Sequence, residues 1–224
     1  MKKLTVLLLL VSAISYGQNL IKQEVSSFNE LKVFSGLNVE LIKSNKSRIE
    51  ITGDEAENVL IKINKKTLKL SFNFTRSIHP EKVFIRLYYK NPIMLIDANE
   101  GSIVESETAF IQNYIELRAQ EAAKILVSVR VKQLDIKTVS GSEINVDGTA
   151  ESTQVEANTG ASYFGYKVKN VDAKVNSTAG SRVELTTSGI LDANVRLGGL
   201  IYYRGTPEVL KTKKVLGGTI EQVN

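Results

Sequence analysis

The chain has 224 residues, 42% of them hydrophobic, which is enough for a substantial buried core. It has no cysteine, so disulfides, cysteine nucleophiles and cysteine-bound metals are excluded. The formal charge is +5, positive and negative residues are interspersed, and no long run of like charges occurs, so the pattern does not predict nucleic-acid binding.

Residues 1–17 have the pattern of a secretory signal peptide. Lys2 and Lys3 form a basic start, residues 4–11 are apolar, and small residues precede the expected cleavage after Gly17. A membrane-spanning helix needs about 20 apolar residues, more than this run contains, and no later stretch is long and apolar enough. We therefore expect an exported protein that does not span a membrane and is found in the periplasm, on the outer surface or outside the cell.

Residues 18–99 predict a series of short strands separated by polar turns. Residues 49–52 show the alternation typical of a sheet with one buried and one wet face. Residues 54–58 could form one helical turn. The expected strands are 31–34, 39–43, 48–52, 58–64, 67–74, 82–89 and 94–98. Their irregular spacing leaves open whether they begin the structure that follows or cap it.

From residue 100 to the end, a short pattern returns about every 19 residues. The residue three positions after each corner is apolar and favours β structure. The corners are Gly101, Ala122, Gly141, Gly160, Gly180, Gly198 and Gly217, and the apolar residues are Val104, Ile125, Ile144, Tyr163, Val183, Ile201 and Ile220. A repeat of this length is too short for a pair of helices, which needs about 33 residues or more, and fits one turn of a β-solenoid.

Each repeat also contains a second set of mostly apolar positions, seven and five residues before the corner, as at Leu134 and Ile136. Small hydroxyl and amide residues such as Thr138, Ser140 and Asn158 lie just before the corners, where they can bond to the backbone. The sequence therefore predicts an all-β protein, a single-stranded parallel β-helix over residues 100–224, with an N-terminal β-rich portion or cap over residues 18–99.

Residues with catalytic or metal-binding chemistry are few. The single histidine, His79, lies in a turn-like phrase before Pro80, and we interpret it as a surface residue. Asp135, Asp172 and Asp192 fall at scattered positions of the repeat, so they do not predict a Ca²⁺ site. We expect no catalytic residue, no metal and no cofactor.

Four side chains are candidates for a binding surface, because they lie at positions of the repeat that should point outward. They are Phe164, Tyr166, Tyr202 and Arg204. Phe164 and Tyr166 share one turn and Tyr202 lies two turns on, so the rings should be roughly 10 Å apart, given strands about 4.8 Å apart. Such rings are suited to a sugar chain or a partner protein. The alternative interpretation is that they only shield the sheet beneath.

Several phrases of the sequence resemble the head-domain family of putative autotransporter adhesins, the head GIN domain family. They are VSGSEINVDG at 139–148, NTGASYFGY at 158–166, STAGSRVEL at 177–185 and LGGLIYYRGTPEV at 197–209, together with FSGLNVELIKSNKSRIEITGDE at 34–55. The resemblance covers roughly Val33 to Glu221. The resemblance implies a parallel β-helix similar in architecture to pectin-lyase-like proteins, and an exported protein of the cell envelope that acts in adhesion.

The sequence therefore favours a non-enzymatic, adhesin-like binding module that contacts glycans or surface proteins through an exposed face of the β-helix. One alternative is a polysaccharide-active enzyme, a lyase or a hydrolase, on the same scaffold. A second alternative is a structural or assembly protein of the envelope.

Overall fold

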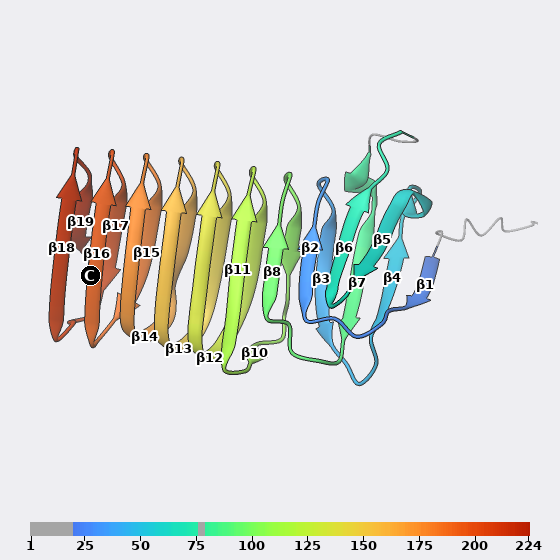
Figure 1. Cartoon of the computed structure of the whole chain (residues 1–224), viewed down its shortest axis with the longest axis horizontal. Helices are drawn as coiled ribbons and strands as arrows, with labels where there is room; N and C mark the ends of the chain where they lie inside the picture. Colours follow the sequence, from blue (N-terminus) through green and yellow to red (C-terminus); the bar gives the residue numbers. More distant parts are fainter. Residues whose placement is uncertain (1–19, 76–78) are drawn as a thin grey trace, which may run out of the picture.

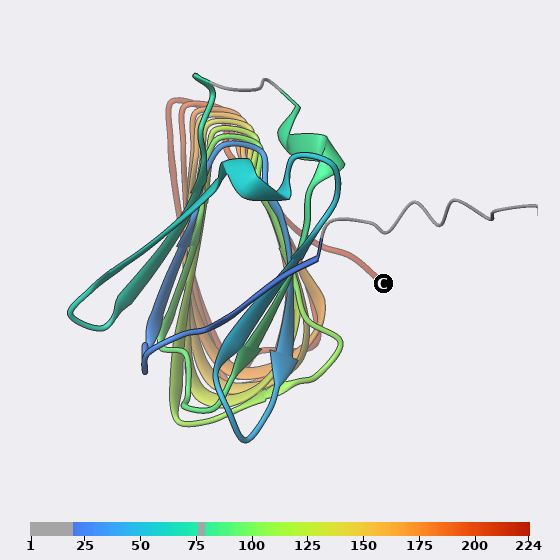
Figure 2. The same ribbon diagram turned by 90° about the vertical axis from the view of Figure 1, so that its right-hand side faces the viewer.

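The computed structural model describes residues 20–75 and 79–224, so the signal peptide predicted for residues 1–17 lies outside the described residues. The chain forms an elongated stack of β turns that follow one another along the long axis (Figure 1). Seen along that axis, the turns superimpose as a flattened loop with one tight corner (Figure 2). The predicted all-β parallel β-helix is confirmed. Helical structure in the described residues is confined to two 3-10 turns, η1 (Ala56–Asn58) and η2 (Pro80–Lys82).

The turns build two sheets that face each other across the core. Sheet I contains, in spatial order, β1 (Leu20–Glu24), β4 (Arg48–Thr52), β7 (Phe84–Tyr89), β3 (Asn38–Lys43), β9 (Ile103–Glu105), the first halves of β12 (Lys124–Val139), β13 (Glu143–Asn158) and β14 (Ser162–Thr178), then β15 (Arg182–Thr187), β17 (Leu200–Arg204) and β19 (Thr219–Gln222). β10 (Phe110–Ile111) pairs in parallel with Val129 and Arg130 of β12.

Sheet II contains β5 (Val59–Asn64), β6 (Thr67–Phe72), β2 (Glu30–Val33), β8 (Leu95–Ala98), β11 (Tyr114–Gln120), the second halves of β12, β13 and β14, then β16 (Ile190–Arg196) and β18 (Val209–Val215). All pairings from β8 and β9 to the C-terminal end are parallel. The strands predicted for residues 31–98 are present, each end within two residues of the prediction. The sequence analysis missed β1, an edge strand whose exposed residues show no apolar alternation.

The register explains the period of the repeat. Residue 124 pairs with residue 143, and residue 143 pairs with residue 162, so one turn of the solenoid equals one period of the sequence pattern. The apolar position three residues after each corner points into the core, and its side chains are fully buried in every turn but the last. These side chains are Val104, Ile125, Ile144, Tyr163, Val183 and Ile201. Stacking of like residues on successive turns thus supplies the hydrophobic core that no single turn could bury.

The corners are tight turns in which two successive residues have positive φ, the conformation of a type I′ turn. At residues 140 and 141 φ is 55° and 69°, and Ser142 N–H donates to the Val139 carbonyl oxygen at 3.4 Å. Buried hydroxyls close two of these corners. Ser177 lies 2.8 Å from Ser181, and the Ser181 hydroxyl donates to the Ala157 carbonyl oxygen of the preceding turn. The small polar residues at the corners therefore have the structural role expected for them.

The N-terminal strands are hydrogen-bonded to the stack. The β2–β3 turn lies between the β6–β7 turn and the β8–β9 turn, and it is parallel to both. Antiparallel strands β1 and β4 extend sheet I, and antiparallel β5 extends sheet II (Figure 1). Antiparallel strands at this end cover the edge that an open solenoid would expose.

The C-terminal end has no such cover. Leu210, which is in register with buried Leu191, is 47% exposed because no further turn packs against it. Two positions later the inward register holds Thr212, and Lys214 follows in register with buried Val195. A polar and a charged side chain therefore occupy the inward positions at which apolar residues would favour the packing of another turn or another chain.

Candidate binding surface

The outward face of sheet I is a single surface on which side chains line up in rows across the strands. One row passes from Lys22 through Glu50, Arg86, Glu40 and Glu105. It continues through Leu126, Asn145, Phe164, Glu184, Tyr202 and Glu221. The predicted binding residues and the N-terminal strands therefore belong to the same face of the molecule.

Phe164 and Tyr202 lie in this row, separated by Glu184 on the strand between them. Both aromatic side chains are partly exposed, whereas Tyr163 and Ile201, their neighbours in the chain, are fully buried. Two strand spacings separate the two positions, about 10 Å. The register thus gives Phe164 and Tyr202 the outward direction and the spacing expected from the sequence.

Arg182 and Glu184 form an ion pair next to Tyr202. The Arg182 Nε donates to Glu184 Oε1 at 2.7 Å, and the Glu184 carboxylate is buried. The Arg182 guanidinium lies over the Tyr202 ring, 4.6 Å from its centroid. A planar guanidinium that is held by a buried carboxylate restricts the rotamer of the ring on which it stacks. The sequence analysis did not include Arg182, because a repeat pattern shows which positions point outward and not which side chains stack.

Tyr166 and Arg204 come together although two turns separate them. The Arg204 guanidinium lies 4.3 Å from the centroid of the Tyr166 ring. Thr186, on the strand between them, donates its hydroxyl to the Tyr166 carbonyl oxygen at 2.7 Å. Burial raises the pKa of the Tyr166 phenol above its usual value, and the negative charge of Glu184 raises it further.

Tyr166 lies within a change of register in β14. Gly165 pairs with Leu185, but the next pair joins Lys169 to Thr186, so β14 has extra residues opposite β15. Such irregularities bend a strand and redirect its side chains. Tyr166 with Arg204 and Tyr202 with Arg182 thus form two contacting pairs on one sheet, and Phe164 lies in the same row as Tyr202. We name Phe164, Tyr166, Arg182, Tyr202 and Arg204 the aromatic patch.

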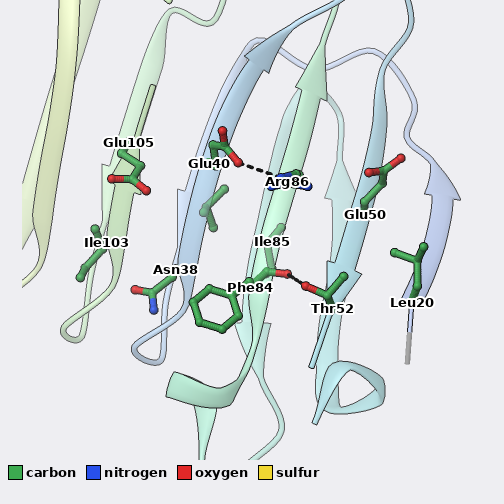
Figure 3. Close-up of a pocket in the computed structure, with 11 residues that line it drawn as sticks. Leu20, Asn38, Glu40, Glu50, Thr52, Phe84, Ile85, Arg86, Ile103 and Glu105 are labelled. Carbon is green, nitrogen blue, oxygen red and sulfur yellow. Dashed lines mark hydrogen bonds and ion pairs between the residues drawn. The ribbon is translucent and has the colours of Figure 1, made fainter. Parts of the chain in front are cut away.

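A pocket lies on the same face among the N-terminal strands. It has a volume of about 630 Å³, and its lining includes Glu40, Phe84, Arg86 and Glu105 (Figure 3). Phe84 is 60% exposed. Arg86 Nε donates to Glu40 Oε2 at 2.9 Å, and this ion pair raises the pKa of the guanidinium. The sequence analysis did not identify this pocket, because its strands are not neighbours in the chain.

Glu50 closes one side of this pocket and has three partners. Arg48 and Lys22 form ion pairs with its Oε1 at 3.4 and 3.5 Å, and the Tyr88 hydroxyl donates to Oε2 at 3.2 Å. Burial alone would raise the pKa of Glu50, but the bonds from Arg48, Tyr88 and Lys22 lower it below its usual value. Glu50 thus stays ionised in the folded protein.

The histidine and the aspartates considered in the sequence analysis are not among the residues that line the pocket or form the aromatic patch. His79 lies before η2 on the surface, and its Nδ1 lies 2.9 Å from Glu81 Oε1. Asp135 accepts a hydrogen bond from the Tyr114 hydroxyl, and Asp172 accepts one from the Ile190 N–H. Within residues 20–75 and 79–224, no group of three histidine or acidic side chains could hold a metal ion, and no helix is long and apolar enough to cross a membrane.

Comparisons with solved structures show the same fold in proteins of low sequence identity. A putative adhesin from Bacteroides fragilis NCTC 9343 superposes with a TM-score of 0.83 and 16% identity, over 93% of this chain and 98% of that chain. A putative adhesin from Parabacteroides merdae ATCC 43184 gives 0.69 and 19%, over 94% and 98%. A putative lipid binding protein from Parabacteroides distasonis ATCC 8503 gives 0.70 and 17%, over 94% and 98%.

No curated protein matches the chain. The model of the family described as "Putative auto-transporter adhesin, head GIN domain" matches residues 27–207, which is most of the chain and includes the aromatic patch. The resemblance carried by the phrases at 139–148, 158–166, 177–185 and 197–209 is therefore confirmed, and this chain belongs to the head GIN domain family.

Proposed function

We propose that this protein is an exported, non-enzymatic binding module of the cell envelope, which contacts a glycan or another surface molecule through the aromatic patch. The observation that carries the proposal is the pairing of Tyr166 with Arg204 and of Tyr202 with Arg182 on one outward sheet face. Family membership supports an adhesin-like role, and the pattern of residues 1–17 supports export.

The physical reason is that the patch offers large, oriented contact area at a small entropic cost. Tyrosine and arginine are the residue types most often responsible for binding energy at interfaces. A ring whose rotamer is already restricted loses little freedom when a ligand covers it. Tyrosine rings also combine an apolar face with a hydroxyl, and this combination suits a sugar, which has an apolar face and polar edges.

Binding of the purified protein to a glycan panel and to an envelope extract tests the proposal. Phe164→Ala and Tyr202→Ala should each weaken binding at least tenfold, as expected for central aromatic contacts. Tyr114→Ala, on sheet II, is the matched control and should leave binding unchanged. Phe84→Ala alters the pocket among the N-terminal strands, so it tests whether binding depends on that region of sheet I instead of the aromatic patch. Equal losses for Tyr114→Ala and Tyr202→Ala would contradict a site at the aromatic patch.

The two alternatives give different results in the same preparation. A polysaccharide-active enzyme would release new reducing ends or unsaturated products from the bound glycan, so turnover would refute the binding-module proposal. A structural or assembly protein would bind no glycan but would copurify with envelope proteins, and its copurification would not depend on Phe164 or Tyr202.

A further inference from the structure

A row of cations runs along sheet I and ends at Arg204 of the aromatic patch. Cross-strand pairs place Arg130, Thr149, Lys169, Thr186 and Arg204 on five successive strands. Basic residues thus alternate with threonines, and the three cations are exposed. None of the three forms an ion pair with an acidic residue in the described part of the chain. We name Arg130, Lys169 and Arg204 the basic row.

The basic row passes through a surface hollow of about 500 Å³. Arg130, Lys132 and Lys169 line it, with Glu151 as its only acidic side chain. Ile111 and Val171 also line it and are 68% and 51% exposed. The hollow thus combines exposed apolar side chains with cations that form no ion pair among the described residues. An anionic ligand with an apolar face could cover both.

The width and the spacing of the basic row limit what can lie along it. Asp147 and Glu151 flank Thr149 on the same strand, and Asp147 forms an ion pair with Lys167 at 3.6 Å. The surface beside the basic row therefore carries charges of both signs, which does not suit a broad anionic partner such as a membrane or a nucleic-acid duplex. Cations two strands apart are about 9.6 Å apart. An extended acidic peptide repeats its same-face side chains at a spacing of about 6.7 Å, twice the rise of one residue, so it cannot stay in register with this row.

We propose that the basic row binds a linear acidic polysaccharide, one with a carboxylate on every second sugar, which runs parallel to the solenoid axis and ends on the Tyr166–Arg204 pair. Two sugar units of an extended chain match the two-strand spacing of the cations, and the threonines between them face the neutral sugars. This inference rests on the proposed function, because it names the ligand class of the same sheet face.

The test uses hyaluronan, whose carboxylates alternate in this way, and its methyl-esterified form as a neutral counterpart. Removing two exposed charges with Arg130→Gln and Lys169→Gln should weaken hyaluronan binding about tenfold and leave the neutral form unaffected. Binding of the unaltered protein should weaken with salt, since charges are screened beyond about 8 Å at 0.15 M. Lys137→Gln with Lys174→Gln removes the same charge from the same two strands on sheet II and should change nothing.

Three outcomes would overturn the inference. They are equal binding of hyaluronan and its methyl ester, equal losses for the two double variants, and binding of poly-glutamate as tight as that of hyaluronan. Tyr202→Ala distinguishes this failure from failure of the proposed function. If it abolishes binding of the neutral polymer while the charge variants have no effect, the aromatic patch stands without the basic row.

Discussion

The Tyr163 ring occupies the space that a side chain at residue 165 would need. A Cβ built on Gly165 would overlap the Tyr163 hydroxyl oxygen and would lie 2.5 Å from Cζ of the same ring. Both residues point into the core from β14, two positions apart, next to the change of register that places Tyr166. The glycine therefore lets one turn hold a large aromatic residue in a row otherwise formed by smaller aliphatic side chains.

Gly165→Ala should destabilise the protein by about 1 to 3 kcal/mol, as expected for an overpacked core. The measurement is chemical denaturation of the single variants and of the double variant with Tyr163→Val. Removing the ring should remove most of the penalty of Gly165→Ala, which gives a large coupling energy in the double-mutant cycle. Additive effects would show that the ring and the glycine are independent.

Truncation should cost much more stability on the inward side of β14 and β17 than on the outward side. Tyr163→Ala and Ile201→Ala remove fully buried side chains and should cost about 2 to 5 kcal/mol. Phe164→Ala and Tyr202→Ala remove partly exposed rings and should cost about 1 kcal/mol or less. Thermal melting of the four variants checks this. Similar melting points for the two pairs would mean that the aromatic patch belongs to the core.

Ala122 has a φ of 60° at a corner where the other turns of the repeat have glycine. Left-handed backbone costs a residue with a Cβ roughly 1 kcal/mol, so Ala122→Gly should stabilise the protein by about that amount. Gly141→Ala is the reverse change. A Cβ there meets nothing within 4 Å, so only the backbone conformation opposes it. Denaturation midpoints that move the same way in both variants would contradict this explanation.

Glu50 should make stability depend on pH below its usual pKa of 4.5. Its pKa is lowered in the folded state, so its contribution is complete above 4.5 and is lost as the pH falls through the lowered value. Glu50→Gln should therefore reduce the fall in melting temperature between pH 6 and pH 3. Glu105 lines the same pocket but has no ion-pair partner among the described residues. The melting temperature of Glu105→Gln should therefore fall as far between pH 6 and pH 3 as that of the unaltered protein.

Local patterns predicted the strands and the repeat because burial follows alternation directly. Glu50 and Thr52 face outward while Ile49 and Ile51 are buried, as their order in the chain indicates. The fully buried residue three positions after each corner follows in the same way from the spacing of the small residues. What alternation specifies is the face of a strand, and it carries no information about which strand lies beside it.

The features that depend on neighbouring strands therefore could not be predicted. Alternation does not show that the β2–β3 turn is inserted between two later turns, or that Phe84 and Glu105 line one pocket. The basic row was missed for a related reason. A strict count of one period from Thr149 leads to Val168, and only the irregularity in β14 brings Lys169 into the row.

The inserted β2–β3 turn also fixes an order of events for a chain that is synthesised from its N-terminus. β2 can gain its first parallel neighbour only when residues 67–70 are available, and its second only when residues 95–98 are. Each later turn pairs with the turn that directly precedes it in the chain, so it can add as soon as it emerges. Pairing of β2 with β8 closes a much longer loop than these pairings do, so it costs more entropy and forms more slowly. Until about residue 105 has been synthesised, β2 and β3 therefore lack their second parallel neighbours, β8 and β9.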